Sequence, residues 1–282
     1  MVYFSAIQLL IGFIMIKNIL TIAGTDPSGG AGIQADIKTF SALGTYAMSV
    51  VTAVVAQNTC GVKSYRTLDA EFVGEQIDAV FEDIRVDAVK IGMLANKSIV
   101  LKVVEKLKHY KAKNIVVDPV MVAKSGHHLL DRHAVDAIKY ELLPITTIVT
   151  PNIPEACVLL DQTDPIIEEN MNEAAKAIHQ MGSKWVLLKG GHLKGNICRD
   201  ILCGSEGIYN FSSERFVTKN DHGTGCTLSS AITALMPNTE MIDCVGNAKA
   251  FLNQALINSS ELDVGHGHGP LHHFHDLWPN HE

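Results

Sequence analysis

Short apolar runs alternate with stretches in which apolar residues recur every three or four positions, from residue 18 to about residue 190. Continuous apolar runs are typical of strands buried on both faces, and the longer spacing is typical of amphipathic helices. Because the two alternate, the pattern predicts a parallel sheet covered by helices on both sides. The predicted strands are residues 19–23, 49–56, 88–91, 114–118, 147–150 and 185–189. The predicted helices are residues 33–43, 70–83, 98–109, 132–142, 154–160 and 168–181, and the second of these should bury Phe72, Ile77, Val80 and Phe81.

The pattern changes after Gly191. Residues 199–202 and 207–211 are two short apolar runs separated by the turn sequence GSEG, which predicts a small β-hairpin at the edge of the sheet. The last third of the chain is mostly helical and ends in a helix over residues 241–258. Since no repeat or low-complexity linker interrupts the chain, we expect a single α/β domain over residues 18–282.

The first 17 residues are interpreted as an N-terminal extension. Residues 2–16 are apolar, but they lack the basic start and the small-residue cleavage site of a signal peptide, and they are short for a membrane span. Met15 lies just before the first predicted strand, so the simplest explanation is that translation starts there rather than at Met1.

Composition and charge exclude several classes of function. A hydrophobic content of 47% supports a large core, and a net charge of −7 without any basic run argues against nucleic acid as a partner. The six cysteines form no C-x-x-C pair, which is typical of reduced thiols in the cytoplasm. We therefore expect a cytoplasmic protein without a membrane partner.

Glycines and polar residues collect directly after the predicted strands. In open parallel sheets, ligands bind outside the carboxyl ends of the strands, so these residues are expected to meet along one edge. They include Gly24, Gln57, Met93, Asp118, Asn152 and Lys189.

The sequence DHGTGC at residues 221–226 precedes a helix-like run and is a candidate anion-binding turn. A Gly-x-Gly turn at a helix start directs free backbone N–H groups and the positive end of the helix dipole at one point. Gly223, Thr224 and Gly225 would form this turn, with Cys226 at its mouth, where the same field is expected to acidify the thiol. Taken alone, the motif is equally compatible with a glycine-rich corner that has no chemical role.

The glycine-rich loop at residues 24–36 resembles two nucleotide-binding motifs without meeting either. It lacks the Gly-Lys-Ser/Thr ending of a P-loop. A GxGxxA pattern starts at Gly30, but the acidic residue that a dinucleotide-binding fold needs about twenty positions later is replaced by the sequence around Gln57. We therefore reject NAD binding, while Asp36 on the following helix could reach a polar ligand.

Gln57 is a candidate for recognising a nitrogen ring. Its amide offers one acceptor and two donors, which match a ring with an amino group beside a ring nitrogen, such as an aminopyrimidine. The alternative is a strand-end glutamine that bonds to the backbone.

Asn152 and Glu155 lie one turn apart at the start of a predicted helix, and so on one face. With Asp118 they could supply oxygen ligands for a hydrated Mg²⁺ ion. The alternative is a helix cap followed by an exposed glutamate. Lys189 precedes two glycines at a strand end and could contact a phosphate, although a surface lysine is the default interpretation.

With these residues in place, the chain resembles the hydroxymethylpyrimidine/phosphomethylpyrimidine kinases of thiamine biosynthesis, in the ribokinase-like superfamily. The resemblance covers residues 19–275 and is carried by long motifs in the same order along the chain. They are GTDPSGGAGIQADIKTFSALG from Gly24, VVTAVVAQNT from Val50, KIGML from Lys90, VVDPVMVAKSG from Val116, TPNIPEA from Thr150, LLKGGH from Leu187, HGTGCTLSSA from His222 and VGHGHGPLHHFH from Val264.

The resemblance implies a ribokinase-like three-layer α/β/α sandwich that uses ATP and Mg²⁺ and forms a homodimer. Its expected reactions are phosphorylation of 4-amino-5-hydroxymethyl-2-methylpyrimidine and then of the monophosphate. For the substrate, it implies that Gln57 binds the aminopyrimidine edge, with Gly24, Asp36 and Met93 around the ring and its hydroxymethyl arm.

For the nucleotide, the resemblance implies that Asp118, Asn152 and Glu155 form the magnesium-phosphate cluster and that Lys189 contacts the ATP phosphates. The turn from Gly223 to Cys226 would be the anion hole. Sugar kinases of this superfamily carry an aspartate base where this chain has Cys226, so it stays open whether the thiol acts as a base or only as part of the anion hole.

Two other functions compete with this prediction. Pyridoxal kinase is the enzymatic rival, because pyridoxine also carries a hydroxymethyl arm on a six-membered nitrogen ring. The other is a catalytically silent regulator that binds a pyrimidine or a nucleotide, since a fold does not guarantee an activity.

Overall fold

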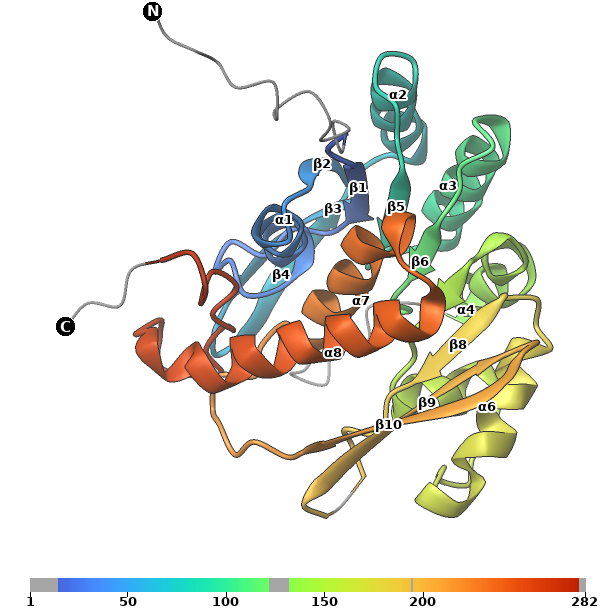
Figure 1. Cartoon of the computed structure of the whole chain (residues 1–282). Helices are drawn as coiled ribbons and strands as arrows, with labels where there is room; N and C mark the ends of the chain where they lie inside the picture. Colours follow the sequence, from blue (N-terminus) through green and yellow to red (C-terminus); the bar gives the residue numbers. More distant parts are fainter. Residues whose placement is uncertain (1–14, 122–131, 194, 279–282) are drawn as a thin grey trace, which may run out of the picture.

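An eight-stranded sheet runs through the centre of the molecule, in the order β10-β9-β8-β7-β6-β5-β1-β2 (Figure 1). The computed structural model describes residues 15–121, 132–193 and 195–278. Six of its strands are parallel (β2, β1, β5, β6, β7 and β8), and β9 and β10 form an antiparallel hairpin at one edge. The strands are β1 (Asn18–Ala23), β2 (Tyr46–Val51), β5 (Ala88–Ile91), β6 (Ile115–Val117), β7 (Ile148–Val149), β8 (Trp185–Leu188), β9 (Ile197–Gly204) and β10 (Gly207–Glu214).

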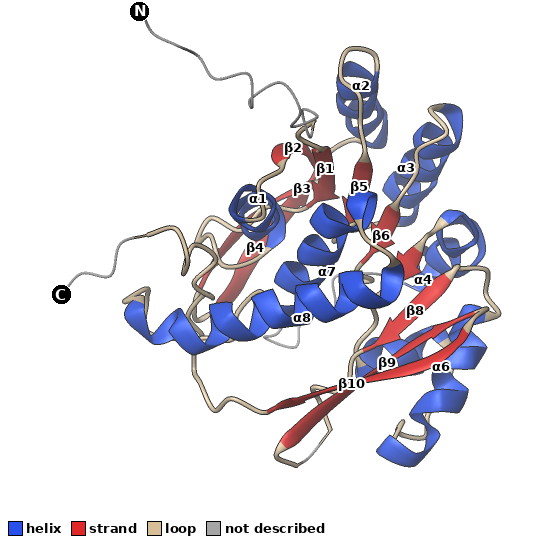
Figure 2. Ribbon diagram, viewed as in Figure 1, coloured by secondary structure: helices blue, strands red, loops and turns tan. Residues whose placement is uncertain are grey.

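Helices cover both faces of the sheet and complete three layers (Figure 2). Successive residues of β1 point to opposite faces: Ile19 packs with Phe40 of one helical layer, and Leu20 with Val73 of the other. Both faces are therefore buried, which explains the continuous apolar strands. One layer holds α1 (Gly32–Ala42), α7 (Thr224–Leu235) and α8 (Met241–Ile257); the other holds α2 (Ala70–Phe81), α3 (Lys97–His109), α4 (Arg132–Ala137), α5 (Ile153–Leu159) and α6 (Met171–His179). The predicted sandwich with its edge hairpin is confirmed.

The predicted strand 49–56 is wrong as a single element. Strand β2 ends at Val51, and β3 (Ala53–Asn58) pairs with β4 (Gly61–Thr67) in a separate two-stranded sheet. At the bend, the Thr52 hydroxyl donates to the Met93 carbonyl at 2.6 Å. The apolar run continues through the bend without glycine or proline, so its periodicity does not mark the change of sheet.

Two helices differ in detail from their prediction. Phe72 is 51% exposed, because α2 buries Val73, Gly74 and Ile77, and position 72 faces away from that stripe. The helix predicted over residues 132–142 changes from α-helix to a π-helical turn at Ile138–Leu142.

Some predictions fall outside the described residues. They include residues 1–14, which make up most of the predicted extension and bear on the choice of start codon. They also include the end of the motif that begins at Val116. Among the helices that are described, none has the length and apolar character needed to cross a bilayer.

Candidate active site

The start of α7 lies at the carboxyl edge of the sheet, against the loop that follows β1. Gly223 caps the helix with a φ of +85°, and a Cβ at this position would overlap the carbonyl oxygen of Gly30. Only glycine fits both the left-handed backbone and the close approach. The predicted turn thus forms, with the amino end of α7 directed at the strand ends.

Asp118 and Lys189 meet directly beneath this turn. Asp118 follows β6, Lys189 follows β8, and the Lys189 Nζ donates to Asp118 Oδ1 at 3.0 Å. A Cβ on Gly225 would lie 3.4 Å from both Lys189 Nζ and Asp118 Oδ2, so the first turn of α7 covers the pair. Although burial opposes the charge on Lys189, the carboxylates of Asp118 and Glu155 hold its pKa above its ordinary value. A fixed positive charge therefore lies beside the amino end of the helix.

Asn152 and Glu155 form a reciprocal cap at the start of α5. The Asn152 side chain accepts from the Glu155 backbone N–H, and the Glu155 carboxylate accepts from the Asn152 backbone N–H, both at 2.9 Å. The two residues thus form the helix cap that the alternative interpretation expected, but Glu155 is only 6% exposed and is not the surface glutamate of that alternative. Burial raises the pKa of Glu155 to about 7, Lys189 lowers it, and the Asp118 carboxylate raises it further.

These carboxylates fit a magnesium ion. The side chains of Asp118 and Glu155 interact unfavourably with each other, and both are buried. A divalent cation would relieve this repulsion, and it needs few protein carboxylates because it keeps several waters. Asn152 would act mainly by orienting Glu155.

Asp26 is a supporting residue of the candidate site that sequence reasoning missed. Its fully buried carboxylate accepts from the backbone N–H of Ser28, Gly30 and Ala31, and pairs with His222 Nε2 at 2.7 Å. Burial opposes ionisation, yet the bonds from His222 and Ser28 hold the pKa of Asp26 well below its usual range. Asp26 thereby ties the glycine-rich loop to the anion-binding turn. The available signal was a carboxylate within a Gly/Ser loop, together with a histidine just before the Gly-x-Gly sequence.

Cys226 lies at the mouth of the turn, as predicted, but its thiol is not acidified. Burial raises its pKa to about 11; the Lys90 ammonium lowers it, and the carboxylates of Asp36 and Asp118 raise it. The helix field does not overcome burial and two nearby negative charges. The expectation that the field acidifies the thiol is therefore wrong, and the thiol holds its proton at neutral pH.

Asp36 lies beneath the site rather than at its surface. Its fully buried carboxylate accepts from Thr21 at 2.6 Å, from Ser230 at 2.7 Å and from Lys90 at 2.9 Å. These partners hold the carboxylate at the base of the site, and its contact with a polar ligand stays a prediction.

Gln57, Gly24 and Met93 border one apolar area above the strand ends. Ala53 and Val55 of β3 are buried, and Gln57, on the same side of the strand, is half-buried. A Cβ on Gly24 would lie 3.2 Å from the sulfur of Met93, which packs with Ala53 and Val55. Gln57 therefore lies at the end of β3, next to this apolar cluster.

The C-terminal segment passes over the anion-binding turn and holds it in place. The His222 backbone N–H donates to the Gly269 carbonyl at 3.0 Å, and His268 Nδ1 pairs with Asp221 at 2.9 Å. His273 is buried, and its Nε2 lies 2.9 Å from the Thr227 hydroxyl on α7. The histidine-rich motif from Val264 is thus part of the support of the site.

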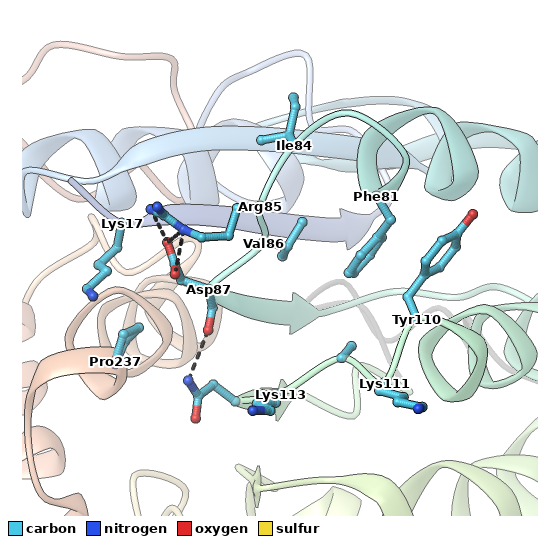
Figure 3. A pocket seen from close by; sticks show the side chains of 12 residues that line it. Lys17, Phe81, Ile84, Arg85, Val86, Asp87, Tyr110, Lys111, Lys113 and Pro237 are labelled. Atoms are coloured by element: carbon cyan, nitrogen blue, oxygen red, sulfur yellow. Dashed lines mark hydrogen bonds and ion pairs between the residues drawn. The ribbon is translucent and has the colours of Figure 1, made fainter. Parts of the chain in front are cut away.

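An open cavity of about 460 Å³ lies at the opposite edge of the sheet (Figure 3). All but one of its lining residues come before β1, β5 or β6 in the chain, so the cavity lies at the amino ends of these strands, and Pro237 after α7 completes it. This cavity is remote from the residues gathered at the carboxyl ends. Its polar character comes from Lys17, Arg85, Lys111 and Lys113, next to the stacked rings of Phe81 and Tyr110.

Known proteins share both the sequence and the fold of this chain. The family profile described as phosphomethylpyrimidine kinase matches residues 26–272. The hydroxymethylpyrimidine/phosphomethylpyrimidine kinase of Escherichia coli (strain K12) is 52% identical over 262 residues, covering 93% of this chain and 98% of that protein. The crystal structure of phosphomethylpyrimidine kinase from Clostridium difficile 630 has 46% identity and a TM-score of 0.75, covering 85% of this chain and 99% of the other.

Pyridoxal kinases share the fold at lower identity. The structure of pyridoxal kinase from Staphylococcus aureus in complex with AMP-PCP and pyridoxal has 33% identity and a TM-score of 0.85, covering 93% of this chain and 95% of the other. Sequence identity favours the pyrimidine kinases, and the resemblance drawn from the motifs is confirmed. The chain belongs to the phosphomethylpyrimidine kinase family, within the ribokinase-like superfamily.

Proposed function

We propose that this kinase uses ATP to phosphorylate 4-amino-5-hydroxymethyl-2-methylpyrimidine, and then phosphorylates the monophosphate to the diphosphate, in thiamine biosynthesis. The observation that carries the proposal is the meeting of a helix-start turn, the Asp118–Lys189 pair and a small apolar cluster around Met93 at one edge of the sheet. The relatives of about 50% identity carry the same activity in their name.

In this proposal the γ-phosphoryl group of ATP lies at the turn from Gly223 to Gly225. The N–H groups at the start of α7 and the Lys189 ammonium would stabilise its charge, and Asp118 and Glu155 would hold Mg²⁺. When bound, the metal neutralises charge on the phosphate oxygens. Phosphoryl transfer needs mainly alignment and charge stabilisation, which these groups would provide.

The pyrimidine ring would lie against Gly24 and Met93, with its amino group and adjacent ring nitrogen paired with the Gln57 amide. This orientation points the CH₂OH arm at the anion-binding turn. Phosphorylation of the monophosphate in the same place requires the ring to bind with its phosphate toward the ATP.

Cys226 would mainly align the hydroxyl rather than remove its proton at the outset. With a pKa of about 11, only about one thiol in several thousand is ionised at pH 7.5. Since the transition state of phosphoryl transfer is loose, a strong base is not required before the P–O bond forms.

Pyridoxal phosphorylation is the second candidate function, because the S. aureus pyridoxal kinase complex shares the fold with a TM-score of 0.85. A coupled assay that follows ADP release from hydroxymethylpyrimidine, its monophosphate and pyridoxal separates the two. We expect the highest kcat/KM for the two pyrimidines. A kcat/KM for pyridoxal that exceeds both would contradict the proposal.

We further infer that the enzyme works in the cytoplasm as a homodimer with small-molecule partners only. The cysteines are all free among the described residues, in line with a reducing compartment. Light scattering of the purified chain should give twice the monomer mass of 30.6 kDa. A single species at the monomer mass would refute the dimer.

A further inference from the structure

The two-stranded sheet β3–β4, which carries Gln57, is separate from the central sheet and is attached to it at its base. The Thr25 backbone N–H donates to the Ala53 carbonyl at 3.0 Å, and the Val55 N–H donates to the Thr25 hydroxyl at 2.9 Å. Both contacts lie in the first half of β3, whereas Gln57 lies near its end. Because a two-stranded sheet is only marginally stable by itself, the position of its far end depends on what that end packs against.

Thr59, in the turn between β3 and β4, contacts the C-terminal segment of the chain. Its carbonyl accepts from the His268 backbone N–H at 2.8 Å, and its hydroxyl accepts from the Gly267 backbone N–H at 3.2 Å. Thr59 is buried, although the residues on either side of it, Asn58 and Cys60, are exposed. The tip of the hairpin is therefore held through one buried residue.

Alternating glycines in the sequence GHGHG at residues 265–269, here called the GHGHG segment, allow this contact. A Cβ on Gly265 would overlap the Thr59 side chain, and a Cβ on Gly267 would overlap the Thr59 carbonyl. A Cβ on Gly269 would overlap the side chain of Asn220, just before the anion-binding turn. Without side chains at these positions, the backbone of the segment packs closely against the hairpin tip and the approach to the turn.

The GHGHG segment is also bonded to the anion-binding turn itself. The Gly269 carbonyl accepts from the His222 backbone N–H at 3.0 Å, two residues after the segment bonds to Thr59 through Gly267. The connection between the hairpin tip and the turn therefore runs through three consecutive residues, 267–269. It joins the side of the site that carries Gln57 to the side where the phosphoryl group would lie.

We propose that Thr59 is a positioning residue of this kinase: through the GHGHG segment, it fixes the end of β3 at a set distance from the anion-binding turn. This role rests on the proposed function of the site. A pyrimidine paired with Gln57 must present its hydroxyl oxygen in line with the γ-phosphoryl group at the turn from Gly223. A displacement of about 1 Å can slow such a transfer on the order of 100-fold, even when the substituted residue touches neither substrate. Loss of the Thr59 contact should therefore act on transfer rather than on ATP binding.

The test removes the Thr59 hydroxyl while keeping the size of the side chain. In Thr59→Val the Gly267 N–H loses its acceptor, and we expect kcat with the pyrimidine to fall about tenfold. The Kd for ATP, measured by isothermal titration, should not change, because the Asp26–His222 pair still holds the anion-binding turn. Thr59→Ser restores the hydroxyl and should recover most of the lost kcat.

A matched control changes a threonine at the other end of the same hairpin. Thr67 is exposed at the end of β4, and Thr67→Val should keep the kcat of the unmodified chain. Circular dichroism verifies that each variant folds, and if Thr59→Val does not, Thr59→Ala removes the same hydroxyl with a smaller side chain. An unchanged kcat without the hydroxyl, an equal fall in Thr59→Ser, or a loss of ATP affinity as large as the loss of kcat would overturn the proposal. The kinase assay of the unmodified chain tests the proposed function separately.

Discussion

At the scale of single residues, the site depends on charges that are held out of water next to one another. Lys189 is the residue in which these interactions meet, because Asp118 and Glu155 both raise its pKa and it adjoins the start of α7. Charge held in such surroundings interacts more strongly with a phosphate than charge at the surface does.

Lys189→Met should reduce kcat by roughly 100-fold, because it removes a fixed charge aimed at the transferred phosphoryl group. It also leaves the buried Asp118 carboxylate without its partner. Steady-state kinetics with the pyrimidine and ATP give the measurement, and Lys184→Met, at an exposed position five residues earlier, is the control. If both variants keep the activity of the unmodified chain, Lys189 has no part in transfer.

Gln57→Leu should weaken binding of the pyrimidine by about 1–3 kcal/mol, because the polar edge of the ring would lose its partners. Affinity for ATP should not change. Isothermal titration with each ligand separates the two effects, and Lys63→Leu, at an exposed position of the paired strand β4, is the control. Equal pyrimidine affinity in all three proteins would show that the ring does not bind through Gln57.

Residues at strand ends were predictable, because the topology of a parallel sheet brings them together whatever the details of packing. This explains why Asp118, Glu155 and Lys189 are adjacent in the structure. The state of Cys226 was not predictable. Its pKa depends on burial and on charges from β5, α1 and the end of β6, and no local sequence pattern shows that these charges act on the thiol.

At the scale of elements, the junction between α7 and the loop after β1 determines the shape of the anion-binding turn. The Asp26–His222 pair and the close approach of Gly223 to Gly30 join the start of α7 to this loop. The sequence pattern predicted the helix and the turn. It did not predict the two-stranded sheet β3–β4 that carries Gln57, because β4 is mostly polar and exposed and so has no apolar run.

Gly223→Ala should destabilise the protein and reduce activity more than 100-fold, since the added methyl group meets the Gly30 backbone. Gly44→Ala is a matched control: Gly44 also has a positive φ, but a Cβ there has no atom within 4 Å. The control should cost about 1 kcal/mol of unfolding free energy, and Gly223→Ala at least about 2 kcal/mol more. Equal losses in denaturant unfolding would mean that the junction tolerates a side chain.

At the scale of the whole molecule, the C-terminal segment joins the last part of the chain to the start of α7. Burial lowers the pKa of His273 to about 3, and its ring lies next to Thr227 inside the protein. That the histidine-rich tail returns to support the turn could not be predicted from the sequence, because long-range contacts of a loop leave no periodic signal.

His273 should make the folded state sensitive to mild acid. Its pKa is near 6.5 in the unfolded chain and about 3 in the folded protein, so the unfolded state takes up the proton first. Stability should therefore fall as the pH drops below 6.5, by about 2 kcal/mol between pH 7 and pH 5 from this residue alone. In denaturant unfolding at several pH values, the unfolding free energy of His273→Gln should fall less steeply with decreasing pH than that of the unmodified chain. His109→Gln, at an exposed position, should keep the pH dependence of the unmodified chain. An unchanged slope in His273→Gln would contradict this assignment.

The central claim is that one site phosphorylates the pyrimidine twice. The most direct measurement is mass spectrometry of the products after incubation of the purified chain with ATP, Mg²⁺ and 4-amino-5-hydroxymethyl-2-methylpyrimidine. We predict that the monophosphate forms first and the diphosphate follows, and that both disappear in Lys189→Met. Absence of any phosphorylated pyrimidine under conditions in which the same preparation converts pyridoxal to pyridoxal phosphate would contradict the account.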